Sequence, residues 1–313
     1  MSLRGWGDSM DKETGLTDKQ KNLLDRIKYE GHKIGHLVGY TDLTEFHSKL
    51  INEIVCGKES ASYCIHRCAY TSSTICLGIA LHILTKPNKK ILLMVQNKGI
   101  AQMRLEIIKK ILESKEIQAL SYILYNKGFT VEIINRCLII SLDSLTCQLV
   151  CVGADKEELA GGHEKDLYIL DGILGLEDCY YETVRAKHLD IYNRINKFEG
   201  RNILFDHSWC YDDLFKHIKG NYIYDCYDTG LLSEERINEI KLAITPSLFS
   251  AQYLCNPYKE IYTKGNQAKL EKLASKMYRL SLKNEDISDI RTEMQEIIDN
   301  CEIIYRYDNR RKL

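Results

Sequence analysis

Short apolar segments alternate along this chain with longer segments of helical periodicity, and this alternation limits the fold more than any other feature. Three apolar segments are Lys90–Val95, Leu167–Leu170 and Asn202–Asp206, and helical patterns cover Ala101–Ser114 and Glu182–Lys197 between them. A strand that is apolar at nearly every position is buried on both faces of its sheet. The sequence therefore predicts an α/β fold, a mostly parallel sheet flanked by helices.

Periodicity and capping residues predict the remaining elements. The further expected strands are Ser62–His66, Thr130–Ile134, Cys137–Leu142, Leu149–Val152 and Tyr222–Tyr227. The further expected helices are Asp18–Tyr29 capped by Thr17, a helix from a cap at Thr41 or Asp42 to Val55, Ser72–Leu84, and Ser233–Leu242 capped by Ser233. A glycine turn is expected at Gly31 and Gly35. Helical patterns over Asn266–Leu282 and Ile287–Cys301 predict a small C-terminal helical appendage.

Charge and composition exclude several classes of function. The 313 residues carry 43 Lys and Arg against 44 Asp and Glu, so the net charge of −1 gives no overall signal for nucleic acid or an anionic membrane. No apolar run approaches the ~20 residues of a membrane span, and the first residues lack a signal-peptide core. The 12 cysteines lack paired zinc-site spacing, so we interpret them as reduced thiols in a cytoplasmic protein.

The end of the segment Ser62–His66 is the first candidate site, because ligands of such sheets bind at the carboxyl ends of strands. A turn at Arg67–Tyr70 follows and leads into a helix, which is the layout of a phosphate-binding P-loop. A working P-loop also contains Gly and a Lys that bridges the outer phosphates. Neither is present here, and only the hydroxyls from Thr71 to Thr74 remain.

The end of Leu167–Leu170 is the second candidate site, since Asp171 follows this apolar strand directly. Four apolar residues and an acid match the Walker B strand, whose Asp orders Mg²⁺. The position next to it, where an active ATPase carries a second carboxylate, is Gly172. For the isolated motif, an Asp that caps the loop after a buried strand is the favoured interpretation.

Several collinear segments together resemble the ATPase domain of large terminase subunits from tailed phages and prophages. The resemblance extends over about residues 31 to 253, and its residues are Gly35–Tyr40, Leu43–His47, Gly57–Glu59, His66-Arg67, Leu81–Ile91, Gly161–His163, Asp166–Asp171, Tyr224–Leu231 and Pro246–Tyr253. It implies a P-loop NTPase-like sheet. Together with the helical patterns at both ends, it predicts three parts: an N-terminal helical segment over residues 1–30, a degenerate P-loop ATPase domain over 31–258 and a helical tail over 259–313.

The departures from the family pattern are concentrated at its catalytic positions. By the resemblance, the phosphate-binding Lys falls at Thr71, the Mg²⁺ hydroxyl at Ser72 and the second acid at Gly172, while Arg67 and Asp171 are kept. The vestigial phosphate site is therefore Arg67, Thr71, Ser72 and Ser73, with Asp171 as the Mg²⁺ ligand. Trp209 is retained from a coupling stretch that is otherwise changed. We also expect the family's nuclease domain to be missing.

These departures predict a pseudoenzyme with little or no ATPase activity, because losing one group that stabilises transition-state charge costs about 10²–10³ in rate. It would act in the bacterial cytoplasm as a binding or regulatory protein, with a terminase, a portal or another phage or host protein as partner. Binding of ATP and Mg²⁺ without turnover stays open, as does loss of all function in a decaying prophage gene.

Two alternatives remain beside this interpretation. The first is an active packaging ATPase in which Lys33, Lys58 or Lys98 supplies the missing cation. The second is a DNA-binding module that uses the basic tail, or an antagonist of phage packaging or host defence. Acids interleaved with the basic residues favour a solvated helix face for the tail. The basic residues concerned are Lys264, Lys269, Lys272, Lys276, Arg279, Lys283, Arg306, Arg310, Arg311 and Lys312. The tail also offers a dimer interface through Leu270, Leu273, Met277 and Leu280, with packing on its own domain as the default.

Overall fold

The computed structural model describes residues 15–154, 165–175, 181–218, 221–261, 264–281, 288–300 and 302–305. Its main feature is an eight-stranded sheet in the order β3-β4-β5-β2-β6-β7-β1-β8. Neighbouring strands from β5 to β8 are parallel, and β3 and β4 join antiparallel at one edge. The strands are β1 (Ala61–Ile65), β2 (Lys90–Val95), β3 (Thr130–Ile134), β4 (Cys137–Leu142), β5 (Leu145–Gly153), β6 (Leu167–Asp171), β7 (Arg201–Asp206) and β8 (Asn221–Tyr224). The predicted α/β class with a mostly parallel sheet is confirmed.

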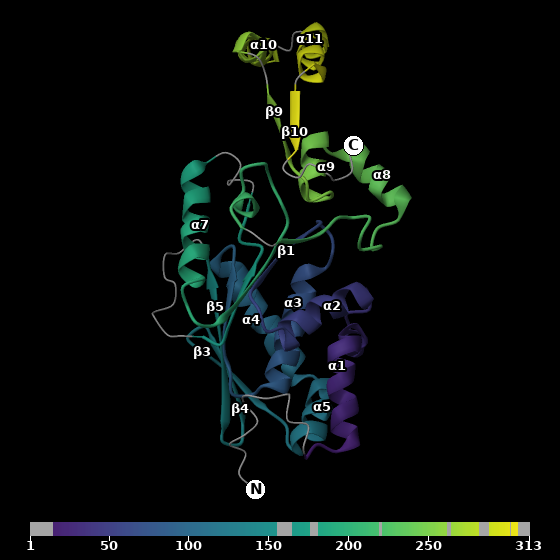
Figure 1. Cartoon of the computed structure of the whole chain (residues 1–313), viewed down its shortest axis with the longest axis vertical. Helices are drawn as coiled ribbons and strands as arrows, with labels where there is room; N and C mark the ends of the chain where they lie inside the picture. The colour runs from purple at the N-terminus through teal and green to yellow at the C-terminus, as the bar shows by residue number, and fades with distance from the viewer. Residues whose placement is uncertain are drawn as a thin grey trace.

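Helices cover both faces of the sheet, with a larger group on one side (Figure 1). The larger group is α1 (Asp18–Leu37), α2 (Glu45–Cys56), α3 (Thr71–Thr85), α4 (Lys98–Glu113) and α5 (Lys115–Tyr125), and the other face carries α7 (Glu182–Ile195) and the short η1 (Leu214–Lys216). In β2, Ile91 and Leu93 pack on the larger group, while Leu92 and Met94 pack on the side of α7. This two-sided burial is the reason that the strand is apolar throughout.

The expected turn at Gly31 and Gly35 was wrong, because α1 continues to Leu37 with a kink at Glu30. Both glycines are buried against neighbouring segments. A Cβ at Gly31 would lie 2.8 Å from the Ile51 side chain of α2, and one at Gly35 would lie 2.8 Å from Leu43. These glycines therefore permit close packing and do not end the helix.

Two further helix starts differ from the prediction. The helix expected after Thr41 or Asp42 begins at Glu45, because Thr44 is its N-cap and the Thr44 backbone N–H donates to Nδ1 of His47. The helix expected over Ala101–Ser114 begins at Lys98, because the Asn97 side chain caps it by accepting from the Ile100 N–H, while its end at Glu113 agrees with the prediction. Ser114 then caps α5, a helix that was not predicted, by accepting from the Ile117 N–H. Cap side chains can start a helix at any of several nearby polar residues, so local sequence placed these two starts imprecisely.

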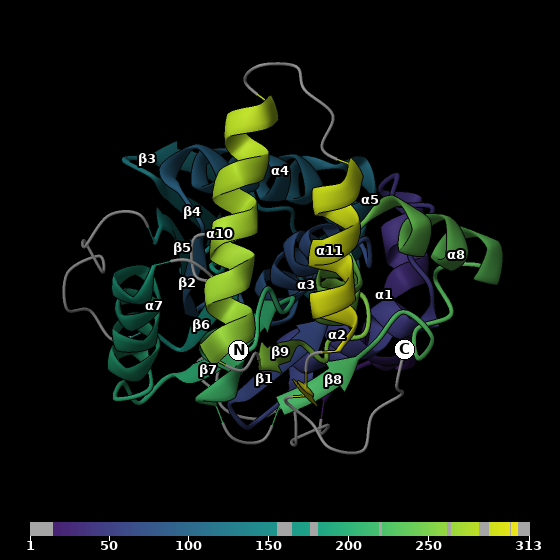
Figure 2. The ribbon, with the colours of Figure 1, turned by 90° about the horizontal axis from the view of Figure 1, so that it is seen from above.

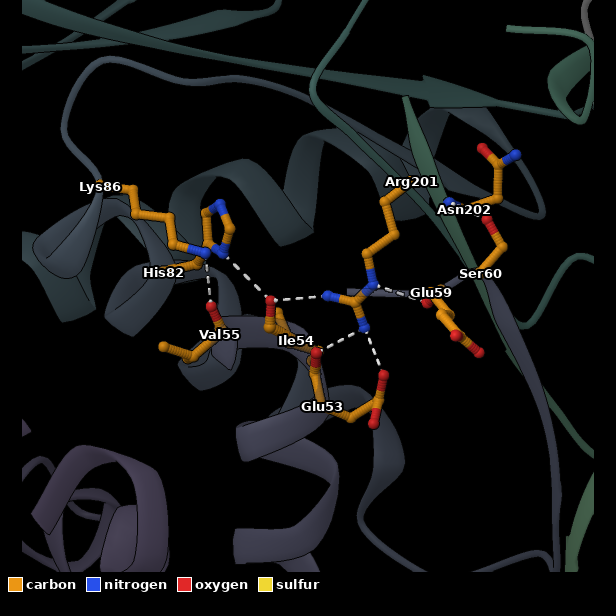
Figure 3. A network of polar contacts seen from close by, with 9 residues as sticks. All are labelled: Glu53, Ile54, Val55, Glu59, Ser60, His82, Lys86, Arg201 and Asn202. Atoms are coloured by element: carbon orange, nitrogen blue, oxygen red, sulfur yellow. Dashed lines mark hydrogen bonds and ion pairs between the residues drawn. The ribbon is translucent and has the colours of Figure 1, made fainter. Parts of the chain in front are cut away.

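Three basic side chains terminate α2 at the amino-terminal end of the sheet (Figure 3). Arg201 of β7 donates to the carbonyls of Glu53, Ile54 and Glu59, His82 donates to Ile54, and Lys86 donates to Val55. The last carbonyls of a helix have no hydrogen-bond donors within the helix, and these three side chains supply the missing donors. The network ties α2 to β7 and to α3.

The C-terminal part combines helices with a small antiparallel ribbon. After α8 (Glu234–Ala243) and α9 (Pro246–Gln252), strand β9 (Tyr258–Ile261) pairs with β10 (Glu302–Tyr305), and α10 (Lys264–Ser281) and α11 (Ser288–Asp299) lie beyond the ribbon (Figures 1 and 2). Leu270, Leu273 and Met277 pack in one apolar cluster with Ile290, Met294 and Ile297. The apolar face that the sequence offered as a dimer interface therefore packs α10 against α11. The side chain of Leu280, its fourth residue, lies outside the described residues.

The basic tail is only partly described. Lys269 forms an ion pair with Glu293 at 2.7 Å, and the Lys272 and Lys276 side chains are exposed. Residues 306–313 and Gly161–His163 lie outside the described residues, as do the side chains of Lys264, Arg279 and Lys283. In the described ranges, no helix is long and apolar enough to cross a membrane.

Candidate functional site

A pocket of about 260 Å³ lies where the adjacent parallel strands β1, β7 and β6 end. All five residues that the sequence analysis assigned to a phosphate and Mg²⁺ site line it: Arg67, Thr71, Ser72, Ser73 and Asp171. Asp206 and His207, at the end of β7, line it as well. The two strand ends selected from the sequence thus belong to one site, with β7 between them.

The loop from β1 to α3 forms one wall and turns sharply without glycine. Cys68 and Tyr70 have φ values of 69° and 50°, in the left-handed region. This conformation costs about 1–2 kcal/mol for each residue with a side chain. His47 holds the loop, since its Nδ1 accepts from Thr44 and its Nε2–H therefore donates to the Ala69 carbonyl at 3.0 Å. The loop keeps a strained shape that other contacts stabilise.

Arg67 and His66 connect this loop to the segment after β8. The backbone N–H of Arg67 donates to the Gln252 carbonyl at 2.8 Å, and its guanidinium donates to the Gln252 side chain at 3.1 Å. The guanidinium also lies over the Trp209 ring, 5.9 Å from the ring centroid. His66 Nε2 lies 2.7 Å from the Thr229 hydroxyl, and burial lowers the pKa of His66 to about 4.

Asp171 is buried, and each of its carboxylate oxygens has a partner. The Ser72 hydroxyl donates to Oδ1 at 3.4 Å, and Nε of Arg104 on α4 donates to Oδ2 at 3.2 Å. Burial raises the pKa of Asp171, while Arg104 and Ser72 act in the opposite direction. The next residue, Gly172, has a φ of 59°, a conformation that disfavours any residue with a side chain.

Asp206 is a second buried acid, at the end of β7. Its oxygens accept from the backbone N–H groups of Leu174 and His207, each at 2.8 Å. Burial raises the pKa of Asp206 well above its usual range. Burial also lowers the pKa of His207 to about 4, and the buried Nε2 of His207 has no hydrogen-bond partner within the described ranges. This side of the pocket therefore favours uncharged forms of both groups.

None of the three lysines considered as replacement cations lines the pocket. Lys33 pairs with Glu30 at 2.7 Å, Lys58 lines a cavity between α1 and the end of α2, and Lys98 lines a cavity beside α4 and β5. Among the described residues, Arg67 is the only Lys or Arg that lines the pocket. A fixed positive charge at the position of the P-loop Lys is thus missing from the described wall.

The residues around Asp171 do not fit a Mg²⁺ ion. Mg²⁺ requires nearly octahedral oxygen ligands, commonly one or two carboxylates with water and phosphate. Here the Asp171 carboxylate already neutralises Arg104, and the adjacent position is Gly172. Over the described residues, no group of three His, Cys, Asp or Glu side chains could hold a metal ion.

Arg104 and the part played by Asp206 were missed by sequence reasoning. Arg104 lies in the helix pattern of α4, among the buried residues Ala101, Leu105 and Ile108. A charge beside the apolar face of a helix implies a buried partner, and this was the available signal. The identity of the partner, Asp171, depends on how α4 packs across the sheet.

Comparison with solved structures finds similarity to large terminases of phages. The large terminase ATPase domain of Thermus Phage P74-26 has a TM-score of 0.44 and 12% identity, over 62% of this chain and 86% of that one. The large terminase of another thermophilic bacteriophage has a TM-score of 0.45 and 12% identity, over 66% of this chain and 52% of that one. The HK97 bacteriophage large terminase has a TM-score of 0.41 and 15% identity, over 76% of this chain and 48% of that one.

The chain is similar to phage large terminase ATPase domains. It spans about half the length of the second and third of these large terminases. No family model and no curated protein matches it.

Proposed function

We propose that this chain is a terminase-like pseudo-ATPase of a phage or prophage, which acts in the bacterial cytoplasm as a binding or regulatory protein related to viral DNA packaging. One observation carries the proposal: the Walker B-like Asp171 is paired with Arg104 in a pocket that has Thr71 and Gly172 at two catalytic positions. The collinear sequence resemblance supports the relation to terminases.

The expected loss of activity follows from the charge that phosphoryl transfer develops. Cations at the outer phosphates and a carboxylate that orients the attacking water supply most of the catalysis. Thr71 cannot supply a cation, and Gly172 cannot orient water with a side chain. Each loss costs about 10²–10³ in rate, and although the two costs need not add, hydrolysis should fall to background.

Phosphate release from ATP and Mg²⁺ tests the proposed inactivity. We expect the wild-type protein to be no faster than Asp171→Ala. Asp190→Ala, which removes an exposed acid of α7 that pairs with Arg194, is the matched control. A wild-type rate that clearly exceeds that of Asp171→Ala but equals that of Asp190→Ala would establish an active ATPase instead.

Binding to packaging proteins tests the proposed role. Purified large terminase, small terminase and portal of a related phage should be mixed with the chain and followed by size-exclusion chromatography. We expect co-elution with at least one of them. If the chain elutes alone in every mixture and also leaves their DNA-stimulated ATPase rate unchanged, the regulatory role is wrong. A thermal-shift series with ATP, with and without Mg²⁺, decides separately whether nucleotide binds without turnover.

A further inference from the structure

Arg104 is held next to Asp171 by the packing of α4. Its neighbours Ala101, Leu105 and Ile108 are buried, and they fix this helix against α3 and the sheet. The Arg104 side chain is 15% exposed and the Asp171 side chain 5% exposed. This largely buried ion pair is stable, because separating Arg104 from Asp171 would leave a buried charge without a partner.

The Asp171 carboxylate has little capacity left for another cation. One oxygen accepts from Arg104 and the other from Ser72. The second nearby acid, Asp206, already accepts from two backbone N–H groups. A divalent ion at Asp171 would also approach the guanidinium, and like charges repel strongly where little water screens them.

We propose that Arg104 is a built-in substitute for a divalent cation: it neutralises Asp171 and thereby excludes Mg²⁺ and Mn²⁺ from this carboxylate. Removing the guanidinium then creates affinity for these ions at Asp171 and Ser72. The inference rests on the proposed function in that both concern the same pocket, but it requires neither nucleotide nor hydrolysis.

The test is Mn²⁺ binding to the whole chain without nucleotide, followed by the electron paramagnetic resonance signal of free Mn²⁺. We expect Arg104→Met, which keeps an aliphatic side chain without the charge, to bind one Mn²⁺ about tenfold or more tightly than the wild type. Arg104→Met with Asp171→Asn should lose this gain. Lys109→Met is the matched control, because it removes a positive charge from the same helix in a surface pair with Glu113. It should bind like the wild type.

Arg104→Gln is the second variant, for the case that Arg104→Met does not fold, since its amide can still donate to Asp171 without a charge. The proposal is overturned if neither variant that folds binds Mn²⁺ more tightly than the wild type. It is also overturned if the wild type binds Mn²⁺ as tightly as Arg104→Met and Asp171→Asn alone abolishes that binding. Asp171-dependent ATP hydrolysis would refute the pseudo-ATPase function, whereas the Mn²⁺ result concerns only the cation at Asp171, so the two failures are distinguishable.

Discussion

At the scale of single residues, buried histidines of this protein serve as neutral hydrogen-bonding groups. His82 is the clearest example, because its Nδ1–H donates to the Ile54 carbonyl while Nε2 is buried with no hydrogen-bond partner in the described ranges. Burial lowers the pKa of His82 to about 3, and the nearby Lys86 acts in the same direction. Protonation of this ring therefore favours the unfolded chain.

His82 should make stability depend on pH. In the unfolded chain its pKa is near 6.5, so between pH 6.5 and about 3 the unfolded state binds a proton that the folded state does not. Stability is then complete above pH 6.5 and falls by about 1.4 kcal/mol for each pH unit below it from this group alone. His82→Asn keeps a donor near Nδ1 but does not titrate. Urea unfolding at pH 7 and pH 5 should show about 2 kcal/mol less pH-dependent loss in the variant.

Other buried histidines contribute to the same loss of stability at low pH in both the wild type and the variant. Burial also lowers the pKa of His66 and of His207 to about 4, so the variant should retain some loss of stability on acidification. Equal pH dependence in wild type and His82→Asn would mean that His82 is solvated or protonated in the folded protein.

At the scale of secondary-structure elements, glycines set the separation of the first three helices. Gly78 of α3 faces α2, where an added Cβ would lie 2.6 Å from Cδ1 of Ile54. Ile54 is fully buried and belongs to the main core, so it has little space to move. The close approach of α2 and α3 thus depends on the absence of one methyl group.

Gly78→Ala should be destabilising although alanine favours helices. Overpacking costs about 1–3 kcal/mol and the gain in helix propensity is about 1 kcal/mol, so we expect a net loss of about 1–2 kcal/mol. Gly99→Ala is the matched control on α4, because Gly99 is exposed and its Cβ would meet only Asn97 Oδ1, at 3.4 Å. It should raise the free energy of unfolding by up to about 1 kcal/mol. Chemical denaturation measures both, and the same sign for both would contradict the packing argument.

At the scale of the whole molecule, the described apolar clusters are distributed between the body and the C-terminal part. Leu273, Ile290 and Ile297 form the buried core of α10 and α11, separate from the clusters on the two faces of the sheet. Figure 1 shows these helices beyond the β9–β10 ribbon, away from the sheet. A small cluster with its own contacts can open locally without unfolding the body.

Leu273→Ala should therefore weaken the C-terminal part selectively. Deleting a buried Leu side chain costs about 2–5 kcal/mol in the unit that contains it. We expect faster amide hydrogen exchange in α10 and α11, and unchanged exchange in β2 and β6. Faster exchange in the central strands to the same degree would show that the two parts unfold as one.

Much of the architecture follows from local pattern. The apolar segments that became β2, β6 and β7 were recognised because a strand covered by helices on both faces must be apolar throughout. The caps Thr17 and Ser233 mark helix starts because their side chains satisfy free N–H groups within one turn. The position of Asp171 at the end of a strand was predictable because it directly follows the apolar run Leu167–Leu170.

Tertiary structure alone decided what surrounds that carboxylate. Arg104 reaches Asp171 from a helix that lies far away in sequence, and β7 brings Asp206 between the two predicted strand ends. Local pattern likewise predicted a turn at Gly31 and Gly35. This prediction was wrong because their close contacts with Ile51 and Leu43 exist only after the helices pack. The physical reason is that local pattern reports which groups avoid water, while charge pairing and close packing depend on which distant segments meet.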